Sequence, residues 1–223
     1  PGQRRGAAEG ALVRRLDGPD ARAEQIAVAL DYSLLVVQAA ERDALRREMA
    51  IAEEVQNQLF PQQLPEMKTL SYTGTCHPAR GVGGDYFDFI KLDDNRLMIA
   101  LGDISGKGVS AALLMASLQG ALRSHATAEC EDLACLVAEL NKLMCASTES
   151  GRFATLFCGV YDDRDRSLRY VNAGHLPPVL VRPNGLQEKQ MREVERLDPT
   201  GMVIGILAEN RYEAREVKLT PGD

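Results

Sequence analysis

The segments Gly81-Val82-Gly83-Gly84-Asp85-Tyr86-Phe87-Asp88 and Gly102-Asp103-Ile104-Ser105-Gly106-Lys107-Gly108 each place an aspartate beside glycines at the end of an apolar run. The residues between them form two apolar runs separated by Asp93-Asp94-Asn95, a pattern typical of strand, turn and strand. A hairpin of this kind would bring Asp85 and Asp103 close together, because they flank the same end of its two strands. Hard oxygen ligands gathered in this way suit Mg²⁺ or Mn²⁺ rather than Zn²⁺.

The bulk composition excludes several classes of protein. A hydrophobic content of 45% in 223 residues supports a packed core and excludes a disordered chain. The net charge of -6 argues against nucleic acid as the main partner. We see no apolar run long enough to span a membrane and no secretory signal peptide. Because the five cysteines include no CxxC pair, we expect a reduced, cytoplasmic chain.

The N-terminal part divides into two segments. Residues 1–19 contain Gly, Arg and Pro and are predicted to be a flexible lead-in, whereas residues 20–60 contain neither Gly nor Pro. Ala, Leu, Glu, Gln and Arg dominate the second segment, which predicts a linker helix about 60 Å long. Apolar residues recur on it at seven-residue intervals, which favours coiled-coil pairing and a homodimer. Packing of the helix on its own domain is the alternative.

Residues 61–223 are predicted to form one further domain. Pro61 and Pro65 stop the helix. The predicted strands are 69–77, 85–92, 96–103, 153–161 and 168–173, with shorter ones around 179 and at 212–219. The predicted helices run from 109 to about 126 and from 132 to about 146. Strands, two helices and more strands indicate an α+β fold with mainly antiparallel sheets.

Two other interpretations of the second acidic segment carry less weight. Asp103 could serve only as a helix N-cap, but that role explains neither the following glycines nor a second carboxylate one hairpin away. The segment also resembles a phosphate-binding P-loop. It departs from that motif because Leu101 occupies a position that needs glycine, and Gly108 one that needs serine or threonine.

Five segments in order resemble the motifs of SpoIIE/RsbU-type serine phosphatases. They are Ala52–Pro61, Pro78–Asp88, Gly102–Met115, Asn172–Pro178 and Pro221–Asp223. These phosphatases are the bacterial branch of the metal-dependent protein phosphatase 2C superfamily, and the similarity covers roughly residues 53–223. The resemblance implies an αββα sandwich of antiparallel sheets flanked by helices, with two Mn²⁺ or Mg²⁺ ions at one edge of the sheets.

The same resemblance assigns roles to individual residues. Asp103 would bridge the two metal ions, and Ile104 would offer its backbone carbonyl to one of them. Asp85 would hold that ion directly or through water. Arg80 stands where some members of the superfamily carry a phosphate-binding arginine, with an ordinary solvated arginine as the equal alternative.

Other polar residues of these motifs are assigned more modest roles. Asp88 is expected to be a supporting or structural carboxylate, Lys107 a solvated loop residue and His175 a structural histidine. Eukaryotic relatives have a histidine two residues after the bridging aspartate. Ser105 stands there in this chain, so the general acid is not identified.

The C-terminal end departs from the family pattern. In the family, the Pro-Gly-Asp motif leads into an apolar strand ending in Thr-Asp-Gly, and a further aspartate follows. Both aspartates are metal ligands there, and neither is present here. We therefore expect the chain to be a fragment whose phosphatase domain lacks its C-terminal part and could be inactive on its own.

The resemblance implies a protein phosphatase that acts on phosphoserine or phosphothreonine of a signalling partner. The family's usual substrates are phosphorylated STAS-domain anti-anti-sigma factors, which implies partner-switching control of sigma factors. Residues 21–47 also resemble the last helix of a GAF sensor, so we expect an upstream sensor domain. The alternative is a degenerate phosphatase that binds its partner without turnover.

Overall fold

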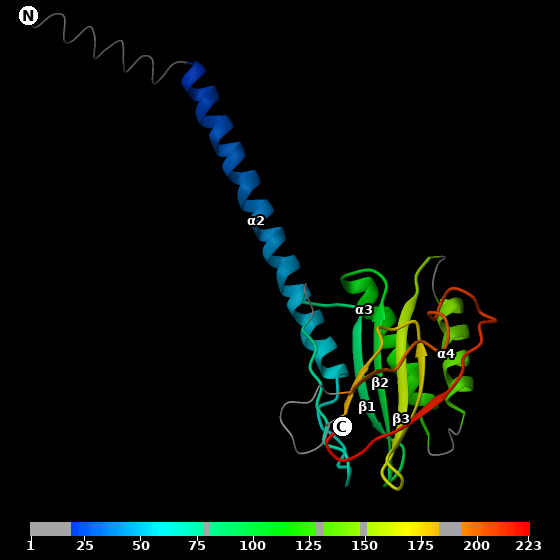
Figure 1. Cartoon of the computed structure of the whole chain (residues 1–223). Coiled ribbons are helices and arrows are strands. Elements are labelled where there is room, and N and C mark those ends of the chain that lie inside the picture. The colour runs from blue at the N-terminus through cyan, green and yellow to red at the C-terminus, as the bar shows by residue number, and fades with distance from the viewer. Residues whose placement is uncertain (1–18, 78–80, 128–131, 148–150, 183–192) are drawn as a thin grey trace, which may run out of the picture. The chain divides into compact units, whose positions relative to one another are not determined.

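The computed structural model describes residues 19–77, 81–127, 132–147, 151–182 and 193–223. The chain divides into two compact units between Ile51 and Ala52. Helix α2, Pro19–Leu59, begins in the first unit and ends in the second, which confirms the long helix expected from the sequence (Figure 1). It ends two residues before Pro61, because a proline disfavours helical geometry in the residue before it.

The first unit consists, in its described part, of α2 up to Ile51. Four apolar side chains spaced along it are each more than half exposed, namely Ile26 (61%), Leu30 (65%), Leu34 (57%) and Val37 (53%). A helix of this kind normally buries its apolar surface against a partner. Even so, no helix in the described ranges is both long and apolar enough to cross a membrane.

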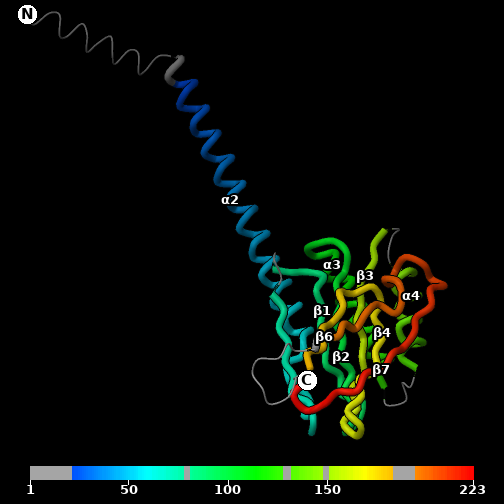
Figure 2. Tube along the Cα trace, viewed as in Figure 1, coloured from blue at the N-terminus to red at the C-terminus, as the bar shows by residue number. Residues whose placement is uncertain are grey.

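The second unit is built on a five-stranded antiparallel sheet in the order β1-β2-β3-β4-β7 (Figures 1 and 2). Its strands are β1 Asp85–Lys91, β2 Arg96–Ile104, β3 Ala154–Asp162, β4 Ser167–Ala173 and β7 Arg215–Lys218. A two-stranded sheet pairs β5, Val179–Arg182, with β6, Glu193–Arg196. Helix α3, Val109–His125, contacts β1 and β2, and helix α4, Leu133–Ser147, contacts β3 and β4. This arrangement confirms the mixed fold of helices and antiparallel sheets.

The two faces of the main sheet carry different hydrophobic clusters. Side chains alternate between faces along a strand, so Met98, Ala100 and Ile104 of β2 share one face. They are buried in the larger cluster, together with residues of α3 and α4. On the other face, Phe157 of β3 belongs to a smaller cluster with Tyr170, Leu180, Leu197 and Val217. By the same alternation, Asp103 lies on the face opposite the helices.

One predicted strand is absent, and one strand was not predicted. Residues 69–77 were expected to be a strand but form no ladder in the structure. The backbone N–H groups of Lys68 and Thr69 instead donate to the carboxylate of Asp163, at 2.7 and 3.0 Å. The Tyr72 ring packs on Phe89, with centroids 4.7 Å apart. Side-chain contacts therefore hold the segment in place of strand pairing. Strand β6, Glu193–Arg196, was not predicted from the sequence.

A buried carboxylate ties β1 to the last turn of α3. The Asp88 side chain is fully buried and accepts hydrogen bonds from Arg123 Nε at 2.7 Å and Nη2 at 2.8 Å. The Tyr86 hydroxyl and the Phe89 backbone N–H also donate to it, at 3.0 and 2.9 Å. Burial, followed by the charge of Asp88, raises the pKa of Tyr86 and keeps that hydroxyl a donor. These contacts give Asp88 a structural role.

We predict that Arg123→Met destabilises the fold by about 2–3 kcal/mol, because it leaves the Asp88 carboxylate buried without its cation. Urea unfolding measures this difference. Arg164→Met is the matched control: it removes an ion pair with Asp162 in which the arginine side chain is 64% exposed. We expect that change to have a much smaller effect on stability, because exposed ion pairs contribute little. Equal losses in the two variants would contradict the structural role of Asp88.

Candidate functional site

Asp85 and Asp103 face each other across the open end of the β1–β2 hairpin. They are direct partners in the antiparallel register, and both are exposed. Side chains of directly opposed residues point to the same face of a sheet, with Cβ atoms about 5 Å apart. The structure therefore brings together the two carboxylates that the sequence analysis singled out.

The backbone beside these carboxylates is held closely in place. The Ile104 N–H donates to the Gly84 carbonyl at 3.2 Å, and a Cβ on Gly84 would lie only 2.6 Å from the Ile104 carbonyl oxygen. Any residue other than glycine would therefore push β1 away from β2 at this point. The Ile104 carbonyl, predicted to be a metal ligand, lies at the same end of the hairpin as the two carboxylates.

Gln56, near the end of α2, supports the same segment. Its side chain is buried; its Nε2 donates to the Gly83 carbonyl at 2.7 Å, and its Oε1 accepts from the Gly83 N–H at 3.0 Å. The pair links the last turns of the helix to the residues that lead into Asp85. Sequence reasoning missed this residue, because the contact joins positions 27 residues apart and no local pattern marks it.

Thr155 and His175 lie beside the pair formed by Asp85 and Asp103. Thr155 of β3 is the register partner of Asp103, on the side away from Asp85. Its Oγ1 lies 2.7 Å from His175 Nδ1, and the His175 backbone N–H donates to Asn172 Oδ1 at 2.8 Å. His175, expected to be structural, is thus half-buried and held next to the aspartate pair. Thr155 was not identified from the sequence.

The electrostatics of this edge favour a cation. Partial loss of hydration raises the pKa of Asp103, and the charge of Asp85 adds to that effect. The pKa of the Cys76 thiol is raised by burial and then by Asp85. Burial lowers the pKa of His175, although Asp103 and Asp85 oppose that shift. Two mutually repelling carboxylates are stabilised when a divalent ion binds between them.

The oxygen atoms gathered at this site could supply part of the coordination shell of a hard divalent ion. Two carboxylates and one backbone carbonyl are the oxygen ligands that Mg²⁺ and Mn²⁺ prefer. Within the described ranges, no three side chains of His, Cys, Asp or Glu gather into a metal site. Lys107 lies exposed in the loop after Asp103. Arg80, the predicted phosphate ligand, lies outside the described residues.

Relatives of this chain include named phosphatases. It is 26% identical over 216 residues to protein IcfG of Synechocystis sp., covering 85% of this chain and 33% of the relative. It is 27% identical over 179 residues to the phosphoserine phosphatase RsbU of Bacillus subtilis, covering 80% of this chain and 51% of the relative. The chain therefore spans between one third and one half of the length of these relatives.

One solved structure shares the fold of this chain, and one family model matches its sequence. The SiaA-PP2C domain of Pseudomonas aeruginosa superposes with a TM-score of 0.63 at 20% identity, over 82% of this chain and 71% of that structure. The family model described as Stage II sporulation protein E (SpoIIE) matches residues 93–223, more than half of the chain. The chain therefore belongs to the SpoIIE family.

Proposed function

We propose that this chain is the catalytic part of a metal-dependent protein phosphatase that hydrolyses phosphoserine or phosphothreonine. The observation that carries the proposal is the direct pairing of Asp85 and Asp103 at the end of the β1–β2 hairpin. Family membership and the similarity to a named phosphoserine phosphatase support it.

The candidate site suggests how its residues would divide the work. Asp103 would bridge two divalent ions, Asp85 would hold one of them, and the Ile104 carbonyl would contribute a third oxygen. Mn²⁺ or Mg²⁺, when bound, activates a water molecule and neutralises the phosphoryl oxygens. Arg80 would position the phosphate by charge-assisted hydrogen bonds. Further oxygen ligands would complete the coordination shells, because Mg²⁺ requires six.

The partners follow from the same family resemblance. The substrate would be a phosphorylated STAS-domain protein in a cytoplasmic partner-switching pathway that controls a sigma factor, and an upstream GAF-like sensor would control turnover. A non-catalytic module that binds the same partner without turnover is the second candidate. Measurement of phosphate release by the full-length protein distinguishes the phosphatase from the non-catalytic module.

The end of α2 is suited to carry a signal to the site. In the second unit, an apolar cavity of about 210 Å³ lies between Val55 and Leu59 of α2, Val82, and residues Val109 and Leu113 of α3. Such a cavity gives the helix end room for more than one packing. A shift there would act on the segment before Asp85 through the hydrogen bonds of Gln56 to Gly83. A free-energy difference of a few kcal/mol between two packings would switch most of the population.

We predict that Asp103→Asn in the full-length protein lowers Mn²⁺-dependent phosphate release from a phosphoserine peptide by at least ~100-fold, because the bridging carboxylate is lost. Asp94→Asn is the matched control. Asp94 is exposed in the turn at the other end of the hairpin, where it pairs with Lys91, and its loss should leave turnover unchanged. Undiminished turnover in Asp103→Asn would remove this residue from the site. Absence of phosphatase activity in the unmodified full-length protein would favour the non-catalytic module.

The raised pKa of Asp103 predicts a stability effect that does not depend on turnover. The folded state holds this proton more tightly than the unfolded state, so stability falls as the pH rises between the unfolded and folded pKa values. Without divalent ions, Asp103→Asn should therefore be more stable than the unmodified chain at pH 7, because the repulsion between Asp103 and Asp85 is removed. Near pH 2.5, below the ordinary aspartate pKa of about 3.9, this advantage should vanish.

Chemical unfolding with and without Mn²⁺ checks this pH effect. The ion should stabilise the unmodified chain and have a much smaller effect on Asp103→Asn, since binding to the folded state alone raises stability. Asp94→Asn should behave in the opposite way at pH 7, because Lys91 lowers the pKa of Asp94. A pH-independent difference, together with equal responses to Mn²⁺, would place Asp103 outside any ion site.

We predict that replacing Leu45 and Met49 with glutamate makes the full-length protein monomeric and uncouples activity from the sensor. Leu45 is 59% exposed, and the apolar surface of α2 needs a partner. Sedimentation equilibrium measures the association. Ala39→Glu with Ala50→Glu is the control pair, because the 3.6-residue period places these exposed positions away from both Leu45 and the apolar side chains around Val37. If the protein with both substitutions remains a dimer and its activity is still regulated, then α2 is only a spacer and the prediction is wrong.

A further inference from the structure

His175 is fixed beside the candidate site by the turn that carries it. The Asn172 side chain, which is fully buried, accepts from the His175 backbone N–H at 2.8 Å and donates to the Leu197 carbonyl at 3.0 Å. Gly174 has a φ of 67°, and a Cβ at this position would lie 2.6 Å from the Val203 side chain. The turn therefore needs glycine there, and it fixes the position of the histidine that follows.

The imidazole of His175 lies next to the aspartate pair. Thr155 is the register partner of Asp103, so their Cβ atoms are about 5 Å apart on the same face of the sheet. His175 Nδ1 lies 2.7 Å from Thr155 Oγ1. Burial is the main influence on the pKa of His175 and lowers it, whereas the charges of Asp103 and Asp85 act in the opposite direction. The ring is therefore within electrostatic range of both carboxylates.

The contact with Thr155 leaves the second ring nitrogen, Nε2, as a donor. Among the residues that the structure describes, the Thr155 hydroxyl has no hydrogen-bond partner other than His175 Nδ1, so its proton is directed to that nitrogen. A neutral imidazole that accepts at Nδ1 carries its proton on Nε2, and a protonated imidazole carries one there as well. Within the same described ranges, Nε2 has no acceptor at hydrogen-bond distance. This N–H can therefore bind an acceptor that comes from outside the chain.

We propose that His175 is a phosphate-binding residue of this site, and that its Nε2–H donates to an oxygen of the phosphoserine phosphoryl group. The inference rests on the proposed phosphatase function and adds a donor from the turn after β4. A hydrogen bond to a charged oxygen is stronger than one between neutral groups, so one N–H fixed in position contributes measurably to binding. Leu176, the next residue, is 84% exposed, so the described part of the chain leaves this turn open to a phosphoprotein.

The position of the ring proton is tested by long-range ¹H–¹⁵N correlation spectra of the histidine rings in this chain. Divalent ions are removed with EDTA, and the pH is held near 8, where an imidazole of lowered pKa is neutral. The chain has three histidines, so His175→Asn identifies the His175 signals by their loss. We expect the proton on Nε2, and a mixture of both tautomers in Thr155→Val. A ring protonated on Nδ1 alone would overturn the proposal.

Two substitutions in the full-length protein separate phosphate binding from a structural role. The glutamine amide reaches the position of Nε2, whereas the asparagine amide reaches only that of Nδ1. His175→Asn should therefore keep the Thr155 contact but lower kcat/KM for a phosphoserine peptide at least ~10-fold, mainly through KM. Competitive inhibition by inorganic phosphate should weaken by a similar factor. His175→Gln should recover most of both losses. Neither change removes the backbone hydrogen bond to Asn172, so the turn should be retained.

His125→Asn is the matched control, because His125 is exposed at the end of α3 and contacts the Ala121 carbonyl of its own helix. It should leave kcat/KM and phosphate inhibition unchanged. The Mn²⁺ concentration for half-maximal turnover should be the same in all variants. If His175→Asn is more active than His175→Gln, or alters the Mn²⁺ requirement but not phosphate inhibition, the ring acts through Thr155 or the ions and the proposal is wrong. Absence of turnover in the unmodified protein would instead refute the phosphatase function itself, and with it this role of His175.

Discussion

The antiparallel ladder between β1 and β2 holds two like charges side by side, and the candidate site depends on that constraint. Asp85 and Asp103 are direct partners in the register, and the backbone hydrogen bonds of the hairpin keep them there despite their repulsion. Gly84 allows the close approach of the strands at this end, and Gln56 holds the segment that leads into it. A fold that keeps such a pair exposed and adjacent places two carboxylates at a defined position on the edge of the sheet.

A second aspartate on the same strand shows what a structural carboxylate looks like. Asp88 lies three residues after Asp85, on the opposite face of the sheet. Its carboxylate oxygens accept hydrogen bonds from Arg123, Tyr86 and a backbone N–H. A buried charge requires such partners, because leaving it without them costs several kcal/mol. Among the residues that the structure describes, no comparable cation pairs with Asp85 or Asp103, and both remain exposed. Hydrogen-bond satisfaction therefore marks Asp88 as structural and leaves Asp85 and Asp103 as candidates for a functional role.

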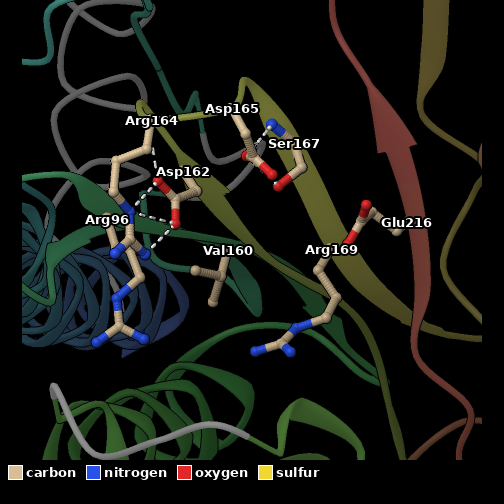
Figure 3. A pocket seen from close by; sticks show the side chains of 8 residues that line it. All are labelled: Arg96, Val160, Asp162, Arg164, Asp165, Ser167, Arg169 and Glu216. Carbon is tan, nitrogen blue, oxygen red and sulfur yellow. Dashed lines mark hydrogen bonds and ion pairs between the residues drawn. The ribbon is translucent and has the colours of Figure 1, made fainter.

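The two ends of β2 have opposite electrostatic character. Asp103 at one end faces Asp85 and Thr155, on the face away from the helices. Arg96 at the other end lines a polar pocket together with Arg169 on the opposite face (Figure 3), and its Nε donates to Asp93. Because residues seven apart on a strand point to opposite faces, a single strand presents one carboxylate and one guanidinium to two separate environments.

The sequence by itself determined the parts of this protein that depend on local interactions. The long helix follows from residues 20–60, which contain neither Gly nor Pro, and the β1–β2 hairpin follows from two apolar runs around a polar turn. The ordered motifs also indicated the family. Only the tertiary structure decided the contacts between distant segments: Gln56 with Gly83, and Thr155 with His175. Residues 69–77 have the composition of a strand, but the carboxylate of Asp163, more than ninety residues away, accepts hydrogen bonds from the N–H groups of Lys68 and Thr69, where that segment begins. Strand register and side-chain capture of backbone donors are set by packing between elements, so no local pattern records them.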